Sequence, residues 1–153
     1  MRKIEYLSGD ASILDLIRSL WQELNDHHTK VSLHFSNAFA TTTFEARKES
    51  LIANAIREGL LVDIAIDSET GREIGYCISC LRTERWGTIE SLYVKPEFRN
   101  TGIGQTLMER ALNWLETKKV VEKTIAVVYG NEQTFAFYAR FGFHPRITTL
   151  KQK

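Results

Sequence analysis

The sequence lacks a strong excess of either charge. Its 153 residues include 20 Lys and Arg against 19 Asp and Glu, which gives a formal net charge of +1. No block of basic residues occurs, so nothing favours nucleic acid as a partner. No apolar run approaches the roughly 18 residues of a membrane-spanning helix, and the polar start with Arg2, Lys3 and Glu5 is not typical of a signal peptide. We therefore expect a cytoplasmic protein that binds neither nucleic acid nor membranes.

Cysteine is scarce, which limits metal and redox chemistry. The only two, Cys77 and Cys80, spell C-x-x-C within the apolar stretch GYCISCL, a pattern typical of a strand. Side chains three positions apart on a strand point to opposite faces, so neither a metal ion nor a disulfide is easily shared. Without a second cysteine pair, we expect no metal site.

The remaining composition is ordinary for a soluble globular protein, with 43% hydrophobic and 25% charged residues. No repeat, linker or low-complexity segment interrupts the chain. Residues 1–153 are therefore expected to form a single domain.

Residues 88–112, TIESLYVKPEFRNTGIGQTLMERAL, organise the chain. The first part is an apolar strand pattern, and Pro96 ends it because proline cannot donate to a sheet ladder. Gly102 and Gly104 follow in a short loop, after which apolar residues recur at helical spacing. The first amides of a helix have no partner within it, and glycines let an anion approach the backbone. With Arg99 nearby to add a planar cation, the pattern predicts a site for a ligand with a diphosphate.

Two common phosphate-binding loops do not fit the spacing. A Walker loop needs a lysine where this chain has Gln105, and a dinucleotide fingerprint needs a third glycine where it has Leu107. A bare G-x-G loop is usually a helix-entry turn without a ligand, but here a strand, a proline and an arginine precede it. The pattern R-x-x-G-x-G preceded by V-x-P is formed by Val94, Pro96, Arg99, Gly102 and Gly104. It resembles the acyl-CoA site of the GNAT N-acetyltransferase superfamily.

The expected elements mix hairpins with a crossover. A hairpin turn is predicted at SETG with Gly71, and Asp10 is expected to cap the first helix. Residues 26–41 have no clean period. The order is βααβββαβαβ, which predicts an α/β fold with a mixed sheet flanked by helices. Strands are expected at residues 2–7, 60–67, 73–82, 88–94, 123–128 and 143–151, and helices at 10–25, 43–59, after Gly104, and at 131–141.

This order is also the one that the GNAT family uses, so the resemblance extends over nearly the whole chain. A second family motif is similar to NEQTFAFYARFGF at residues 131–143, with the alanine one place from its commonest position. The stretch IESLYVKPEFRNTGIG is similar to the diamine and polyamine acetyltransferase branch, in which a glutamate stands nine residues before the arginine, as Glu90 does. The matching residues of the second motif are Asn131, Ala136, Phe137, Tyr138, Gly142 and Phe143.

The resemblance implies that acetyl-CoA is the cosubstrate. In the family the central strand splays from the next one, and its free amides bond the pantetheine arm and the thioester carbonyl as an added strand would. By resemblance Leu92 and Val94 supply these groups, with Ser91 and Tyr93 on the other face unless a bulge shifts the alternation. Asn131 is expected to bond the pantetheine, or alternatively to cap the short helix. The residues expected to contact the cofactor are Leu92, Tyr93, Val94, Arg99, Asn100, Thr101, Gly102, Ile103, Gly104, Gln105, Asn131 and Tyr138.

Acetyl transfer to an amine needs a base, an oxyanion donor and an acid. Glu90 is the candidate base, acting directly or through water; alternatively it is a solvated charge on a strand. Tyr138 is the candidate acid for the leaving thiolate, because a phenol of pKa about 10 stays protonated at neutral pH. Its alternative is a core tyrosine beside the phenylalanines of its helix.

The acceptor pocket is expected between the first two helices, the central strand and the last hairpin. The candidates are Trp21, His28, Phe35, Trp86 and Glu90. Acidic residues near them, Glu23, Asp26 and Glu84, would suit a cation together with the aromatic rings. Few residues follow the last predicted strand, where many family members carry a further one. Either a second subunit supplies the missing wall in a homodimer, or the pocket is open enough for a peptide.

The expected function is N-acetylation of a primary amine of a small molecule, of polyamine, aminoglycoside or amino-acid type, by direct attack in a ternary complex. Acetylation of protein or peptide amines is the alternative within the same class. A non-catalytic acyl-CoA-binding module is the alternative outside it. Such a module would keep Arg99 and Gly104 but would not need Glu90 and Tyr138.

Overall fold

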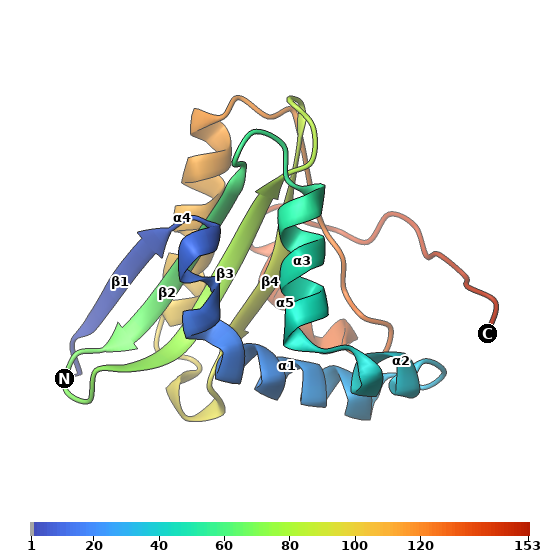
Figure 1. Cartoon of the computed structure of the whole chain (residues 1–153), viewed down its shortest axis with the longest axis horizontal. Helices are drawn as coiled ribbons and strands as arrows, with labels where there is room; N and C mark the ends of the chain where they lie inside the picture. The colour runs from blue at the N-terminus through green and yellow to red at the C-terminus, as the bar shows by residue number, and fades with distance from the viewer. Residues whose placement is uncertain (1) are drawn as a thin grey trace.

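A five-stranded sheet forms the centre of the computed structural model, which describes residues 2–153 (Figure 1). The strands lie in chain order, and all neighbours are antiparallel except β4 and β5, which are parallel. This confirms the predicted mixed sheet. The strands are β1 (Ile4–Gly9), β2 (Leu60–Asp67), β3 (Arg72–Leu81), β4 (Trp86–Val94) and β5 (Glu122–Ile125).

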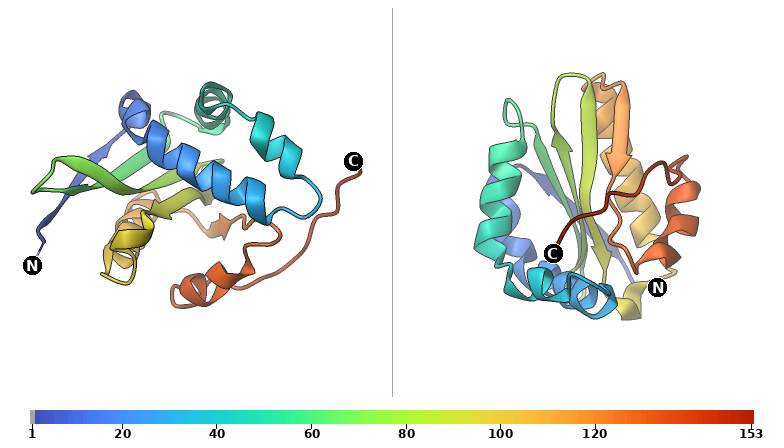
Figure 2. Two further views of the ribbon diagram at one scale, coloured as in Figure 1. Left: turned by 90° about the horizontal axis from the view of Figure 1, so that it is seen from below. Right: turned by 90° about the vertical axis from the view of Figure 1, so that its right-hand side faces the viewer.

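Helices cover both faces of the sheet, with α1 to α3 on one side and α4 and α5 on the other (Figure 2). Each face buries its own apolar cluster, one beneath α1 and α3 and the other beneath α4. In residues 2–153 no helix has the length and apolar character needed to cross a bilayer. The α-helices are α1 (Arg18–Val31), α2 (Ser36–Thr41), α3 (Phe44–Asn54), α4 (Ile103–Thr117) and α5 (Phe135–Ala139), with 3-10 turns η1 (Ala11–Ile17), η2 (Pro96–Phe98) and η3 (Glu132–Thr134).

The two cysteines lie on opposite faces of β3, as the strand pattern predicted. Cys77 belongs to the cluster beneath α4, and Cys80 to the cluster beneath α1 and α3. Both are free and buried. Burial raises the pKa of both thiols, that of Cys80 to about 11. Neither is therefore a nucleophile or a metal ligand at neutral pH.

The first helix is longer than predicted. Asp10 caps its start as expected, accepting a hydrogen bond from the amide of Ser12 at 2.9 Å. The helix does not end near Asn25, whose side chain donates to the carbonyl of Phe39 at 2.8 Å. It continues to Val31, so the segment without a clean period contains helical residues. It ends where Ser32 becomes extended and its amide bonds the His28 carbonyl at 2.9 Å.

Other boundaries also shift. The helix expected to reach residue 59 ends at Asn54, because Arg57 and Glu58 adopt left-handed backbone angles, with φ of 44° and 55°. The strand expected at 123–128 covers only Glu122–Ile125. The turn SETG forms as predicted, with Gly71 at φ 68°.

The predicted last strand, residues 143–151, is absent. This segment has no regular structure and runs away from the sheet towards the C-terminus (Figure 1). Phe143 packs against the cluster beneath α4, but Ile147 and Leu150 remain in solvent, 84% and 91% exposed. The alternating pattern suits a strand, but a strand needs a neighbour, and no described strand pairs with it.

Candidate functional site

A cleft opens where β4 and β5 separate. The two strands pair only from Trp86–Glu122 to Ile89–Ile125, and beyond this point they diverge. The space between them is a cavity of about 840 Å³, lined by the second half of β4, residues 125–128, the loop before α4, and α5. Parallel neighbours that separate leave backbone groups without partners, so the cleft can accept an extended ligand.

The backbone of β4 presents two residues to this cleft. The amide of Lys95 donates to the carbonyl of Ile74 at 2.8 Å, so Lys95 directs its backbone towards β3. Successive residues of a strand direct their backbone groups to opposite edges. The amides and carbonyls of Val94 and Leu92 therefore point to the edge away from β3, into the cleft. A bulge lies just before them: Ile78 pairs with Ser91 and Ser79 with Ile89, which leaves Glu90 as the extra residue.

The bulge sets the side-chain positions. Ser91 hydrogen-bonds the hydroxyl of Tyr76 at 2.6 Å, and Tyr93 joins the cluster beneath α1. Leu92 and Val94 pack against the cluster beneath α4. Side chains therefore alternate along this segment as expected.

The start of α4 closes one end of the cleft. Gly102 has φ of 89°, which favours glycine, and the first helical hydrogen bond runs from Thr106 to Gly102 at 3.0 Å. The amides of residues 103–105 therefore have no partner within the helix and can bind an anion. At Gly104 an added Cβ would come no closer than 3.5 Å to Phe137. Packing of the protein therefore does not require this glycine, whereas close approach of a ligand would.

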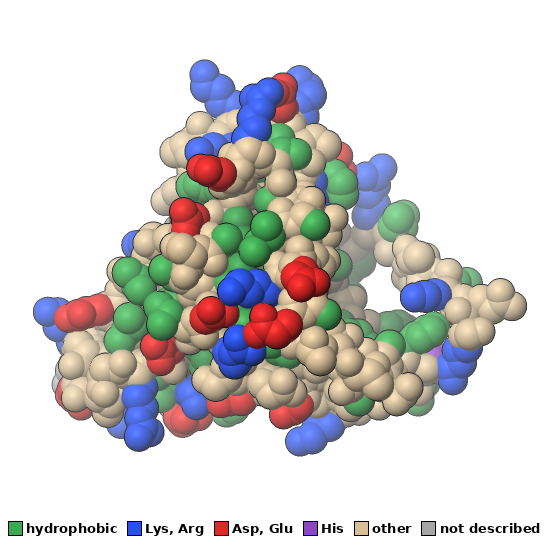
Figure 3. Space-filling view, viewed as in Figure 1, with side chains coloured by type: hydrophobic (Ala, Val, Ile, Leu, Met, Phe, Trp, Pro, Cys, Tyr) green, Lys and Arg blue, Asp and Glu red, His purple; other side chains and the backbone are tan. Residues whose placement is uncertain are grey.

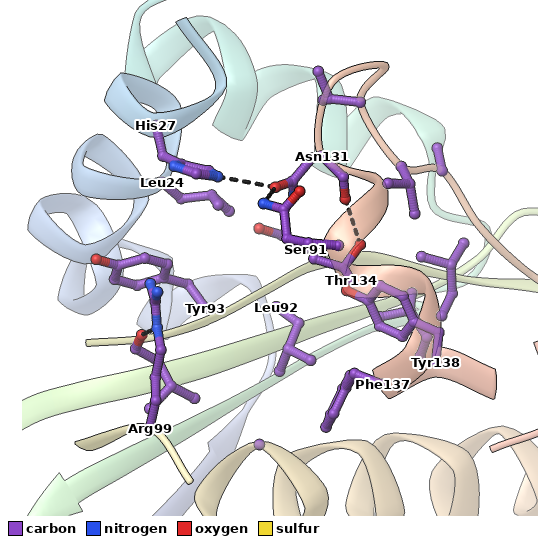
Figure 4. A pocket seen from close by; sticks show the side chains of 18 of the residues that line it. Leu24, His27, Ser91, Leu92, Tyr93, Arg99, Asn131, Thr134, Phe137 and Tyr138 are labelled. Atoms are coloured by element: carbon purple, nitrogen blue, oxygen red, sulfur yellow. Dashed lines mark hydrogen bonds between the residues drawn. The ribbon is translucent and has the colours of Figure 1, made fainter. Parts of the chain in front are cut away.

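Two arginines flank this helix start. The Arg99 guanidinium lies over the Tyr93 ring, 5.5 Å from its centre, and donates to the Val94 carbonyl (Figure 4). Arg140 lies on the other side, donates to the Gln105 side chain at 2.7 Å and stacks on Phe137. Free amides between two cations form a site for an anion with more than one phosphate.

Asn131 connects the loop before α5 to α1. Its Oδ1 lies 2.9 Å from Nε2 of His27 (Figure 4). The same oxygen also accepts from the Gln133 side chain. The side chain does not cap the short helix, and its amide nitrogen has no partner among residues 2–153. It is thus free to donate into the cleft. Beside it, burial and the neighbouring charge of His27 lower the pKa of His28 to about 4.

Tyr138 lies deeper in the cleft, facing β4 (Figure 4). Its ring packs edge-on against Phe137 at 5.3 Å between ring centres. Burial raises the pKa of the phenol well above its usual range, so the hydroxyl is protonated at neutral pH. It makes no hydrogen bond with the described residues, which leaves its proton available to a ligand.

The Glu90 side chain extends to the face of the sheet that α1 to α3 cover, where two arginines bind it. Arg47 of α3 donates to Oε2 at 3.0 Å, and Arg82 donates to Oε1 through Nε at 2.9 Å and through a terminal nitrogen at 2.5 Å. Thr88 adds a fourth bond at 2.6 Å. Burial alone would raise the pKa of Glu90, but these hydrogen bonds and the two positive charges outweigh it and lower the pKa.

A family model, the Acetyltransferase (GNAT) family, matches residues 17–143 of this chain. The chain belongs to the GNAT acetyltransferase family. A comparison with curated proteins found no match.

Solved GNAT-type structures share the fold. The aminoglycoside N-acetyltransferase AAC(6')-Iy in complex with CoA superimposes with a TM-score of 0.70 at 17% identity, covering 100% of this chain and 95% of that one. The PaiA N-acetyltransferase of Thermoplasma acidophilum, in complex with coenzyme A, has a TM-score of 0.70 at 21% identity, covering 96% and 93%. The BH1408 protein of Bacillus halodurans, as a tetramutant, has a TM-score of 0.73 at 17% identity, covering 97% and 99%.

The structure brings most of the expected GNAT cofactor residues to the cleft. Two do not line it: the Thr101 hydroxyl donates to the Phe98 carbonyl at 2.5 Å, and the Ile103 side chain is buried in the core. The lining residues among those expected are Leu92, Tyr93, Val94, Arg99, Asn100, Gly102, Gly104, Gln105, Asn131 and Tyr138.

Only some of the residues expected to form the acceptor pocket line the cleft. His28 and Glu90 line the cleft. Trp21 does not, because it is buried against Phe44 in the core, with ring centres 5.6 Å apart. Phe35 and Trp86 also lie outside the lining; the Trp86 indole instead donates to Thr124 at 2.8 Å, where β4 begins.

Three arginines were not foreseen from the sequence. Arg140 lies inside the second family motif, at a position the motif leaves open between Tyr138 and Gly142. Arg47 stands 43 positions before Glu90, and Arg82 directly follows β3. Arg82 stands eight positions before Glu90, and the turn between β3 and β4 brings the two side chains together. The short connection TERWG between the two strands was a signal that could have indicated this contact, because a short connection favours an antiparallel pair.

Proposed function

We propose that this protein is an acetyl-CoA-dependent N-acetyltransferase that acetylates a primary amine of a small molecule by direct attack in a ternary complex. One observation carries the proposal: the unpaired edge of β4 leads to free helix amides set between Arg99 and Arg140. This arrangement matches an extended ligand that ends in a diphosphate. Membership of the GNAT family and neighbours named as CoA complexes support it.

In this proposal the diphosphate binds the amides of residues 103–105, with the two arginines on either side. The pantetheine arm lies along β4 and bonds the backbone of Leu92 and Val94. The free amide nitrogen of Asn131 donates to the arm from the opposite wall. The residues that line the cleft include no cluster suited to a metal ion, and the proposed reaction does not require one.

The transfer proceeds by addition and elimination. The amine lone pair attacks the thioester carbon, and the carbonyl electrons move to oxygen, where a β4 amide stabilises the oxyanion. As the intermediate collapses, the C–S bond breaks and the thiolate takes the phenolic proton of Tyr138. The attacking nitrogen loses a proton to water, and the phenolate regains one from solvent, which balances the step.

Glu90 remains the candidate to receive the amine proton, but its surroundings restrict how. A carboxylate that accepts four hydrogen bonds and has a lowered pKa is a poor direct base for an ammonium group. We therefore propose the route through water, with Glu90 orienting that water rather than holding the proton.

The acceptor belongs to the class of small amines. One neighbour is AAC(6')-Iy bound to a bisubstrate analogue, CoA-S-monomethyl-acetylneamine, with a TM-score of 0.67 at 18% identity, covering 99% of each chain. Polyamines, aminoglycosides and amino acids are the candidates, with peptide amines as the alternative. The homodimer and the cytoplasmic location expected from the sequence remain predictions; light scattering checks the first.

The decisive experiment offers acetyl-CoA and a panel of polyamines, aminoglycosides, amino acids and peptides, and measures release of free CoA thiol. An enzyme releases thiol with at least one of these amines. A non-catalytic module binds acetyl-CoA in calorimetry but releases none. Absence of both heat and turnover contradicts the whole proposal.

A further inference from the structure

Two arginines share a single carboxylate on the face of the sheet covered by α1 to α3. Arg47 and Arg82 both contact Glu90, and their side chains are 26% and 27% exposed, whereas that of Glu90 is 7% exposed. Arg47 also donates to the backbone carbonyl of Glu90 at 3.2 Å. The three side chains therefore form one fixed unit at the bulge. Glu90 belongs to the lining of the cleft, and the two arginines, which do not line it, contact Glu90 from the face covered by α1 to α3.

This unit carries a net positive charge and unused donors. Two guanidinium groups against one carboxylate leave one positive charge in excess. The hydrogen bonds to Glu90 use one terminal nitrogen of each arginine and Nε of Arg82, which leaves the other terminal nitrogen of both without a partner in residues 2–153. A planar anion such as a carboxylate stabilises this partly buried excess charge, because its two oxygens can accept hydrogen bonds from both free nitrogens.

The acidic residues expected to attract a cation are engaged elsewhere. Glu23 binds Lys95 at 3.0 Å and Tyr93 at 2.8 Å, and Glu84 pairs with Arg57 at 2.5 Å. Asp26 accepts from Gln22 at 2.9 Å. Among the described residues that line the cleft, Glu90 is the sole carboxylate, and its charge is already shared by two guanidinium groups.

Two other cations of this helical face, Arg18 and Lys48, are paired with carboxylates. Basic and acidic side chains lie next to one another there (Figure 3), in pairs that include Lys48 with Asp15 at 3.0 Å and Arg18 with Glu45 at 2.5 Å. Arg47 and Arg82 differ from these two, because Glu90 is the one carboxylate that both contact among residues 2–153. His28, which also lines the cleft, is neutral at pH 7 because burial lowers its pKa.

From this charge distribution we infer that the acceptor is an amine that also carries a carboxylate, an amino-acid-type substrate, with Arg47 and Arg82 as its specificity residues. The inference rests on the proposed acetyltransferase function. Glu90 and Leu92 are two positions apart on β4, about 7 Å along the strand. With a hydrogen bond at the carboxylate end, a short amino acid spans this distance and directs its nitrogen at the thioester. A polycation in the same place would meet the excess positive charge.

The test uses matched acceptors that differ only in the carboxylate. Lysine, lysinamide and cadaverine form one set, and histidine, histidinamide and histamine a second. We expect kcat/KM, read as thiol release, to be at least tenfold higher for each amino acid than for its amide or its decarboxylated form. Equal or greater turnover of the forms without a carboxylate would overturn the inference.

Variants assign the effect to the two arginines. In Arg82→Gln and Arg47→Gln we expect the preference to fall at least fivefold, mainly through a higher KM. Lys48→Met, which removes a neighbouring cation of α3, is the matched control and keeps the preference. A preference that survives both arginine changes refutes the assignment, and thermal melts identify a variant that fails to fold.

A binding measurement separates this inference from the proposed function. N-acetyl-lysine and its amide are titrated into the complex of the unmodified protein with CoA. Tenfold tighter binding of the carboxylate form supports the inference even if no amine is turned over, whereas equal binding rejects it. Loss of turnover in every set, together with no CoA binding, rejects the proposed function instead.

Discussion

Arg99 binds the carbonyl oxygen of Val94 through its Nε, at 2.9 Å. That oxygen lies on the edge of β4 that faces the cleft, where an added strand would find its partner. The arginine therefore satisfies a backbone group at the edge along which, in our proposal, the pantetheine arm lies. The Tyr93 ring beneath the guanidinium holds it in this position.

Replacement of Arg99 should weaken CoA at its diphosphate. We expect Arg99→Ala to raise the Kd for CoA by about 10- to 100-fold, since a lost charge-assisted bond to phosphate costs about 1.5–3 kcal/mol. Calorimetry measures the change. S-acetyl-pantetheine, which lacks the diphosphate, is the control, and its KM should change little. A similar loss for both ligands would place the arginine at the pantetheine arm instead.

Gly104→Ala tests whether that glycine serves the ligand. The nearest atom to the new Cβ is 3.5 Å away, an ordinary contact, and alanine favours a helix over glycine by up to about 1 kcal/mol. We expect unchanged or higher stability in urea, together with at least tenfold weaker CoA binding. Gly102→Ala is the contrast: at φ 89° it should lose about 1 kcal/mol of stability. Unchanged CoA affinity in Gly104→Ala would contradict a phosphate site at this turn.

Tyr138→Phe tests the proposed acid. Loss of the phenolic proton should lower kcat by about 10²-fold, the lower end of the range for general acid catalysis, with little change in the Kd for acetyl-CoA. An acyl donor with a more acidic leaving thiol needs less protonation, so the variant should lose less with it. An equal loss with both donors would indicate a packing role.

Stability should depend on the protonation of His28. Its pKa is about 4 in the folded protein, against 6.5 as the ordinary value, so the unfolded chain binds the proton more tightly. The contribution of neutral His28 to the free energy of unfolding is therefore complete above pH 6.5 and is lost as the pH falls towards 4. Allowing for its partial exposure, we expect a loss of about 1–2 kcal/mol in this window. Urea unfolding at pH 7.5 and 5 measures it, and His28→Gln should remove the difference. Glu90, whose pKa is lowered from 4.5, contributes only at more acidic pH.

The local signals in the sequence were sufficient for the central part of the fold. The run from Thr88 to Val94, the break at Pro96 and the glycines at 102 and 104 each act on the adjacent backbone, so the strand, the turn and α4 form where predicted. The opposite faces of Cys77 and Cys80 follow from the same short-range alternation. Such features need no knowledge of distant contacts.

Features that depend on tertiary partners were not accessible in this way. The Asn25 side chain is buried and bonded to the Phe39 carbonyl, 14 positions away, and residues 143–151 form no strand because no described strand pairs with them. At the site, the sequence indicated Glu90 but not its ion pairs with Arg47 and Arg82. The role of a carboxylate depends on its neighbours, and these come from elsewhere in the chain.

The buried thiols of Cys77 and Cys80 have a practical consequence for measuring turnover. Assays that detect released CoA rely on disulfide reagents, which react with thiolates accessible to solvent. Both protein thiols are inaccessible and largely protonated at assay pH, so the folded protein should consume almost no reagent. The rate of colour formation then reports the product alone, and a slow second phase would reveal unfolding in the cuvette.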